Sequence, residues 1–123
     1  MKVKFTPLER IYDSERGSNY ALDTGEYMSF LITKRLEGSV SGDHSHPGKT
    51  REKNPEVMHL LDGEIVFAWR EDGEDCARKL DEPTRIEISA GTWHKITALT
   101  DIVILEEGRL SQEDYEEDTE RST

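Results

Sequence analysis

The chain has 123 residues, of which 33% are hydrophobic and 35% are charged, and its formal net charge is −11. This length suits a single domain, and the negative charge makes nucleic acid and anionic membrane surfaces poor partners. Because so polar a chain forms a thin core, we expect two subunits to share apolar surface as a homodimer.

Short β-rich segments separated by Gly, Pro and Asp predict an all-β fold over residues 1–110, a single antiparallel β-barrel or jelly-roll sandwich. The expected strands, in chain order, are 2–5, 27–36, 39–46, 56–61, 64–70, 84–88, 93–99 and 102–106. The polar stretch 13–25 is expected to form a loop or irregular arm that Tyr12 and Tyr20 pack down. Asp62 and Gly63 favour a tight turn, so strands 56–61 and 64–70 are expected to pair directly.

Both ends of the chain are polar. The first ten residues lack the apolar run of a signal peptide, and no segment approaches the roughly twenty apolar residues that span a bilayer, so the sequence predicts a cytoplasmic protein. Residues 111–123 are an acidic C-terminal tail, interpreted as a solvated end or a short helix. The single Cys76 is interpreted as an incidental loop residue.

Histidines and one glutamate form the candidate site. Side chains alternate faces along a strand, so His44 and His46 should project to the same side. On 56–61, the same alternation places Glu56 with Met58 and Leu60, which are expected to line the pocket. If this face is the barrel interior, the buried carboxylate needs a partner.

His94 begins a later strand and can also point inward. Three imidazoles and one carboxylate suit a divalent transition metal such as Fe, Mn, Zn or Ni, so His44, His46, Glu56 and His94 are candidate metal ligands, and the histidines are candidate catalytic residues. The alternatives are solvated histidines on an edge strand and an exposed carboxylate at Glu56. His59 has the opposite parity and is expected to face outward or to lie in the core.

Two segments resemble the motifs of the cupin superfamily. Gly38, His44, His46, Glu56 and Gly63 resemble its first motif, although nine residues separate the second histidine from the glutamate where three or four are usual, which predicts a bulging loop. The segment 89–94, SAGTWH, resembles the second motif, and the resemblance implies that its histidine is the last metal ligand.

Within the cupins, the segment 86–108 resembles small WbuC-type proteins associated with surface-polysaccharide synthesis. Segments 16–36, 42–46, 92–96 and 110–118 more loosely resemble nucleotide-sugar 3,4-ketoisomerases of the WxcM-like group. This second resemblance implies that a histidine pair transfers protons without metal.

Three functions follow from these patterns. The first is a metal-dependent enzyme that acts on a small polar substrate such as a sugar or nucleotide-sugar, by isomerisation or, as an alternative, as a dioxygenase. The second is metal-free isomerisation with His44 or His46 as base and with Lys34, Arg35, Lys49 or Arg51 holding a phosphate. The third is a module that binds sugar or metal without turnover.

Overall fold

The computed structural model describes residues 2–121 and is built mainly of strands, which confirms the predicted all-β antiparallel class. The elements are β1 (Val3–Pro7), β2 (Glu9–Ser14), β3 (Gly17–Ala21), β4 (Phe30–Arg35), β5 (Val40–Ser45), the 3-10 turn η1 (Arg51–Lys53), β6 (Glu56–Asp62), β7 (Ile65–Glu71), β8 (Glu74–Leu80), β9 (Thr84–Ile88), β10 (His94–Ala98), β11 (Ile102–Glu107), α1 (Gln112–Glu117) and β12 (Glu120–Arg121).

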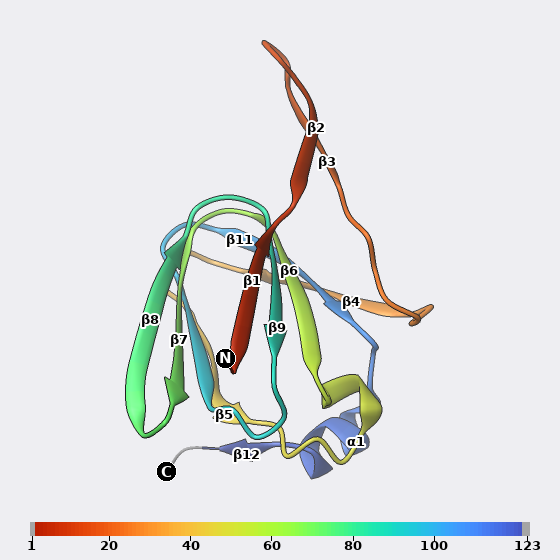
Figure 1. Cartoon of the computed structure of the whole chain (residues 1–123), viewed down its shortest axis with the longest axis vertical. Coiled ribbons are helices and arrows are strands. Elements are labelled where there is room, and N and C mark those ends of the chain that lie inside the picture. The colour runs from red at the N-terminus through yellow and green to blue at the C-terminus, as the bar shows by residue number, and fades with distance from the viewer. Residues whose placement is uncertain (1, 122–123) are drawn as a thin grey trace.

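Two five-stranded antiparallel sheets enclose the core (Figure 1). One has the order β1-β9-β6-β11-β4, and the other has the order β12-β5-β10-β7-β8. Buried and partly exposed residues alternate along β7, β9 and β10, so one side of each sheet turns inward. Ile65, Phe67 and Trp69 of β7 illustrate this, since all three are buried in the core, where they meet Leu60 and Ile86 from the facing sheet.

The turn at Asp62 and Gly63 has a different role from the one that the sequence suggests. The strands β6 and β7 lie in different sheets, so the expectation that they pair directly is wrong. The chain instead crosses here from one sheet to the other and packs against the loop 99–101, where the amide of Glu64 donates to Oγ1 of Thr100 at 3.0 Å. A tight turn is compatible with either connection, and only tertiary pairing distinguishes them.

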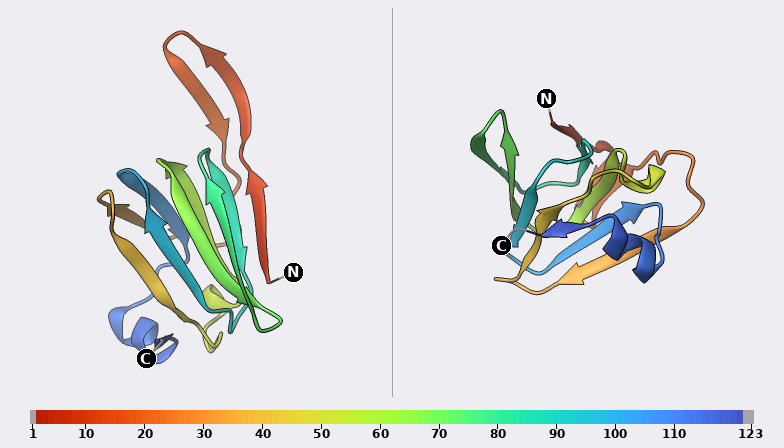
Figure 2. Two further views of the ribbon diagram at one scale, coloured as in Figure 1. Left: turned by 90° about the vertical axis from the view of Figure 1, so that its left-hand side faces the viewer. Right: turned by 90° about the horizontal axis from the view of Figure 1, so that it is seen from below.

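The arm expected at 13–25 is largely a β-hairpin. Strands β2 and β3 form a separate two-stranded sheet that stands clear of the barrel (Figure 2). Tyr12 and Tyr20 lie exposed on it, so they do not pack the arm down. Strand β8 was also missed, because it is an edge strand whose side chains are mostly exposed and therefore show no apolar alternation.

The C-terminal acidic segment closes the lower end of the barrel (Figure 1). Ser111 caps α1, accepting from the amide of Asp114 at 3.1 Å. The short helix expected as one alternative is therefore present, and after it β12 extends the second sheet by pairing with β5, so residues 111–121 join the barrel and do not form a solvated end. In the described part of the chain no helix is long and apolar enough to cross a membrane.

Gly63 should be essential to the crossing between the sheets. Its φ is +94°, and a Cβ there would clash with Asp101, Ile102 and Thr100. We expect Gly63→Ala to lower the free energy of unfolding in urea by about 2 to 4 kcal/mol, combining backbone strain with overpacking. Gly73→Ala is the matched control: its φ is +77° but no atom lies within 4 Å of the added Cβ, so only about 1 kcal/mol should be lost. Equal losses would contradict the packing argument.

Candidate functional site

Three histidines converge inside the lower end of the barrel. His44 lies near the end of β5, His46 follows that strand, and His94 begins β10, which pairs with β5. One ring nitrogen from each lies within 4.8 Å of those of the other two, and all three residues are buried. The structure therefore brings together the three histidines that strand alternation and motif spacing singled out.

Glu56 reaches the same point from the facing sheet. Its Oε1 lies 3.3 Å from Nε2 of His94 and 3.6 Å from Nε2 of His46. Two residues further along β6, Met58 lines the cavity as expected. Leu60 does not line it: this side chain is fully buried in the apolar core, one step deeper along the same strand face.

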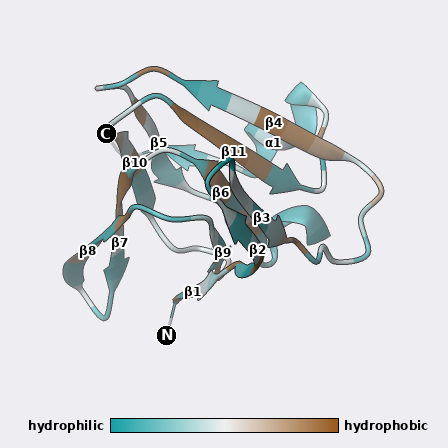
Figure 3. Cartoon of the chain, turned by 90° about the horizontal axis from the view of Figure 1, so that it is seen from above, coloured by the Kyte–Doolittle hydropathy of each residue, from teal (hydrophilic) through white to brown (hydrophobic). Residues whose placement is uncertain are grey.

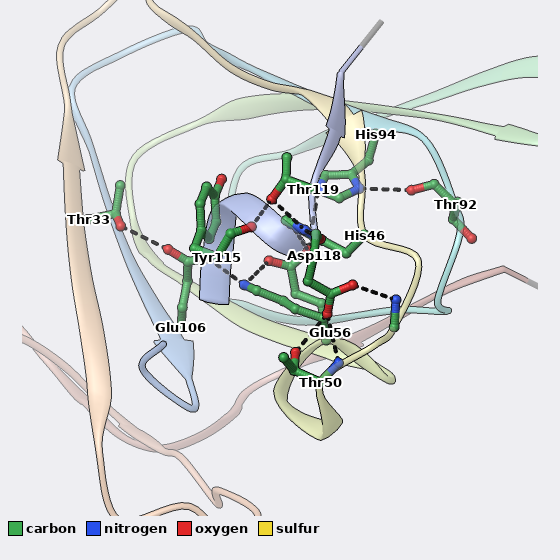
Figure 4. Close-up of polar contacts among 12 residues, drawn as sticks. Thr33, His46, Thr50, Glu56, Thr92, His94, Glu106, Tyr115, Asp118 and Thr119 are labelled. Atoms are coloured by element: carbon green, nitrogen blue, oxygen red, sulfur yellow. Dashed lines mark hydrogen bonds and ion pairs between the residues drawn. The ribbon is translucent and has the colours of Figure 1, made fainter. Parts of the chain in front are cut away.

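Hydrogen bonds to backbone carbonyls orient two of the imidazoles (Figure 4). Nδ1 of His94 donates to the carbonyl of Thr92 at 3.0 Å, and Nδ1 of His46 donates to the carbonyl of Asp118 at 2.7 Å. A carbonyl only accepts, so Nδ1 carries the proton in both rings, and in a neutral ring with this tautomer Nε2 presents a lone pair towards Glu56.

This arrangement leaves acceptor atoms facing one another. Nε2 of His46 and Oε1 of Glu56 are buried, and neither has a hydrogen-bond partner among residues 2–121. Unpaired buried acceptors are unfavourable, and two that point at the same spot require a proton or a cation between them. The donor set of three imidazoles and a carboxylate fits a divalent transition metal.

A buried lysine that sequence reasoning missed lies beside this carboxylate. Lys53 belongs to η1, in the long loop between His46 and β6, and its Nζ lies 2.9 Å from Oε2 of Glu56 and 3.9 Å from Oε1 of Glu106. Burial alone would lower the pKa of Lys53, but the two carboxylates outweigh it and raise the pKa. An ammonium ion therefore holds the outer oxygen of Glu56 while the inner oxygen faces the histidines.

Glu106 is a second carboxyl group in the cavity. Burial and the charge of Glu56 raise its pKa, and its Oε2 accepts a hydrogen bond from Oγ1 of Thr33 at 3.0 Å. For Glu56 the balance is opposite: burial opposes ionisation, but His94 and Lys53 outweigh it and lower the pKa. The site thus combines an ionised carboxylate with one that keeps its proton to higher pH, a pairing suited to acid–base chemistry.

The sequence carried a signal for Glu106 but none for Tyr115. Glu106 continues the inward alternation of Ile102 and Ile104 on β11, so its parity could have been recognised. Tyr115 comes from α1, which folds back under the barrel and places the ring 5.5 Å from that of His46. Burial raises the pKa of Tyr115, which keeps the phenol protonated and able to donate a hydrogen bond.

The imidazoles of His44 and His46 are kept neutral. Burial, followed by the neighbouring His94 and His46, lowers the pKa of His44 from 6.5 to about 3. Burial likewise lowers the pKa of His46, although Glu56 opposes this. Neutral imidazole is the form that binds a metal or accepts a proton.

The site opens into two adjoining cavities of about 100 Å³ and 480 Å³, which share Thr33, Arg35, Glu106 and Tyr115 in their walls. His44, Glu56 and His94 line the smaller one, whereas Arg109 and Gln112 line the larger. Among the four basic residues considered as phosphate ligands, Arg35 lines both cavities and Lys34, Lys49 and Arg51 line neither.

His59 lies outside this cluster. As its parity predicts, it points to the other side of β6, where it is fully buried and its Nε2 lies 2.6 Å from Oε2 of Glu107. Arg85 and the amide of Gly25 also bind Glu107, at 3.0 and 2.8 Å. This network ties the segment leading to β4 onto the outside of the sheet.

The sequence matches no protein-family model and no curated protein. Among solved structures, it is similar to the sugar 3,4-ketoisomerase QdtA from Thermoanaerobacterium thermosaccharolyticum in complex with TDP, with a TM-score of 0.73, 14% identity and coverage of 98% of this chain and 88% of that one. A mutant of QdtA in complex with TDP-4-keto-6-deoxyglucose gives the same values. A 3,4-ketoisomerase from Helicobacter canadensis has a TM-score of 0.73, 16% identity and coverage of 99% and 92%.

These similarities show the fold. The chain has the antiparallel jelly-roll barrel fold of these sugar ketoisomerases, so the predicted resemblance to cupins, including the WxcM-like ketoisomerases, is confirmed at the level of the fold. The finer resemblance to WbuC-type proteins stays a prediction.

The buried neutral His44 should make the metal-free protein sensitive to acid. Its folded pKa of about 3 lies below the unfolded value of 6.5, so between these values the unfolded chain binds a proton that the folded protein does not. We expect the free energy of unfolding to fall from pH 7 to pH 5 by about 1 to 2 kcal/mol through His44, the lower figure allowing for solvent in the cavity. Urea titrations of wild type and His44→Asn should differ by this amount in their pH dependence; parallel curves would refute the assignment.

Proposed function

We propose that this protein is a metal-binding cupin enzyme that isomerises a small sugar derivative, with His44, His46, Glu56 and His94 as ligands of one divalent transition metal such as Fe, Mn, Zn or Ni. One observation carries the proposal: Nε2 of His46 and Oε1 of Glu56 are buried, face one another and lack partners in the described part of the chain. A cation between them would satisfy both atoms.

In this proposal the metal ion and the side chains have different roles in catalysis. When bound, the metal would polarise a carbonyl or hydroxyl oxygen of the substrate. In its ionised form, Glu106 takes the proton from the hydroxyl-bearing carbon beside a carbonyl and returns it to the former carbonyl carbon, while the hydroxyl proton moves to the former carbonyl oxygen. Its raised pKa suits a group that must both accept and release a proton, and its hydrogen bond from Thr33 fixes its orientation.

The cavities favour a substrate with an anionic group. Arg35 lies in the wall of both, with its Nε donating to Oγ of Ser41 at 3.2 Å, and Arg109 lines the larger cavity. Arginine binds phosphate and carboxylate groups in bidentate fashion, so we infer a phosphorylated sugar or nucleotide-sugar with its reacting end in the small cavity. The TDP ligand of the similar ketoisomerase QdtA supports this substrate class.

A metal-free isomerase is the second candidate, and Lys53 favours it. The lysine ammonium already neutralises Glu56, so the site does not depend on a further cation to compensate that charge. In this version His44 is the base, because its imidazole is neutral and lines the small cavity.

The elemental content of untagged protein, purified without added metal, distinguishes the two candidates. We expect about one transition-metal ion per chain, its loss in His94→Ala, and its retention in Cys76→Ser, which removes the chain's single thiol. Chelation should abolish turnover of TDP-4-keto-6-deoxyglucose, followed by NMR of the product, and reloading should restore it. A metal-free protein whose turnover survives chelation but is lost in His44→Asn would contradict the metal proposal and support the second candidate.

We also propose that the protein is a homodimer whose interface includes the β2–β3 hairpin. An isolated two-stranded hairpin is marginally stable in water, yet this one exposes Ile11 by 60% and Tyr12 by 52%. The edge strand β4 and the turn after it also expose Ile32 by 64% and Leu36 by 73%, and Figure 3 shows hydrophobic residues along β4 and β11. A second copy can cover both surfaces by two-fold symmetry.

Sedimentation velocity tests the dimer. We expect wild type to sediment as a dimer and the double variant Ile11→Asp with Tyr12→Asp to sediment as a monomer with unchanged β-sheet content by circular dichroism, because charge would then replace apolar contact area. Glu74→Ala, on the exposed end of β8, should remain dimeric. A monomeric wild type, or a dimeric double variant, would refute this interface.

A further inference from the structure

Asp118 is the most deeply buried acid of the C-terminal segment. It has 0% exposure, and its carboxylate accepts four hydrogen bonds, from the amides of Gly48, Lys49 and Thr50 at 2.9 Å each and from Oγ1 of Thr50 at 2.7 Å. Burial opposes its ionisation, but these hydrogen bonds outweigh burial and lower the pKa. The carboxylate therefore clamps one side of the long loop that follows His46.

The backbone of Asp118 touches the site itself. Its carbonyl accepts the hydrogen bond from Nδ1 of His46 at 2.7 Å, and Oγ1 of Thr119 lies 3.3 Å from the same nitrogen. The side chain of Asp118 binds residues 48–50 of the loop that follows His46. One residue therefore contacts the histidine through its backbone and the neighbouring loop through its side chain. Figure 4 shows both contacts.

The same clamp supports Lys53 on the other side of the loop. After Thr50 the chain turns through η1, where the amide of Lys53 donates to the carbonyl of Thr50 at 3.3 Å. The Lys53 side chain then reaches Glu56. Asp118 thus holds Thr50, the residue from which η1 starts, and η1 in turn positions Lys53.

We propose that Asp118 is a positioning residue of the site: through its clamp on residues 48–50 it holds its own carbonyl against Nδ1 of His46, so that Nε2 presents its lone pair to the metal. The inference rests on the proposed function, because it assigns this role within the same metal site. A carbonyl that fixes the second nitrogen of a histidine sets its tautomer and strengthens metal binding, and loss of such a partner typically weakens affinity 10- to 100-fold.

The tautomer of His46 is the direct readout. In metal-free protein labelled with ¹⁵N-histidine, we expect wild type to show protonated Nδ1 and bare Nε2 at His46. Asp118→Ala should give a mixture of tautomers and bind Co²⁺ about 10- to 100-fold more weakly by titration. Glu113→Gln, an exposed acid in the first turn of α1, is the matched control and should leave both readouts unchanged.

Two milder variants allow the same measurements if Asp118→Ala does not fold. Asp118→Asn keeps the size of the side chain but removes its charge, and Thr50→Val removes one of the four donors. Folded variants with the wild-type tautomer at His46 and unchanged Co²⁺ affinity would overturn the proposal. If wild type binds no Co²⁺, the metal function fails, but the tautomer comparison still decides whether Asp118 positions His46.

Discussion

The lower half of this barrel is organised by one constraint, the burial of a carboxylate between two sheets. Glu56 is 4% exposed, and an ionised group at that depth must be compensated by hydrogen bonds and opposite charge. The chain supplies the ammonium of Lys53 to one oxygen, while the other oxygen faces the imidazoles of His46 and His94 and has no hydrogen-bond partner in the described part of the chain. The loop from His46 to β6 is long enough to turn through η1 and bring the lysine to the carboxylate.

Along the inward face of a single strand, the residues at one end line the site and the next ones belong to the apolar core. The inward positions, from the site to the core, are Glu56, Met58 and Leu60 on β6, His94, Ile96 and Ala98 on β10, and Glu106, Ile104 and Ile102 on β11. Each strand therefore anchors a polar group with apolar residues of the same face. The apolar part fixes strand positions, and fixed strands keep the polar atoms within a few ångströms of one another.

Strand alternation explains why much of this could be predicted. His44 and Glu56 lie on inward faces that sequence parity identifies, and the strand class follows from the same period. Parity is local, however, and cannot tell which strands pair, so it predicts a hairpin at Asp62 and Gly63, where the chain crosses between the sheets. It also says nothing about Lys53 and Tyr115, which reach the site from a loop and from a helix that no periodic pattern places.

The acidic tail shows this limit most clearly. In the sequence, Asp118 is one of six acids in a polar stretch, and nothing local separates it from its neighbours. In the structure, its carboxylate alone among these six accepts from three successive amides, because β12 pairs with β5 and holds the residues just before it beneath the barrel. The burial of Asp118 therefore depends on the pairing of β12 with β5, a strand that lies far from it in the sequence. A bound cation, by favouring the folded arrangement of His46, would stabilise this closure too, so that metal binding and the docking of the C-terminal segment reinforce one another.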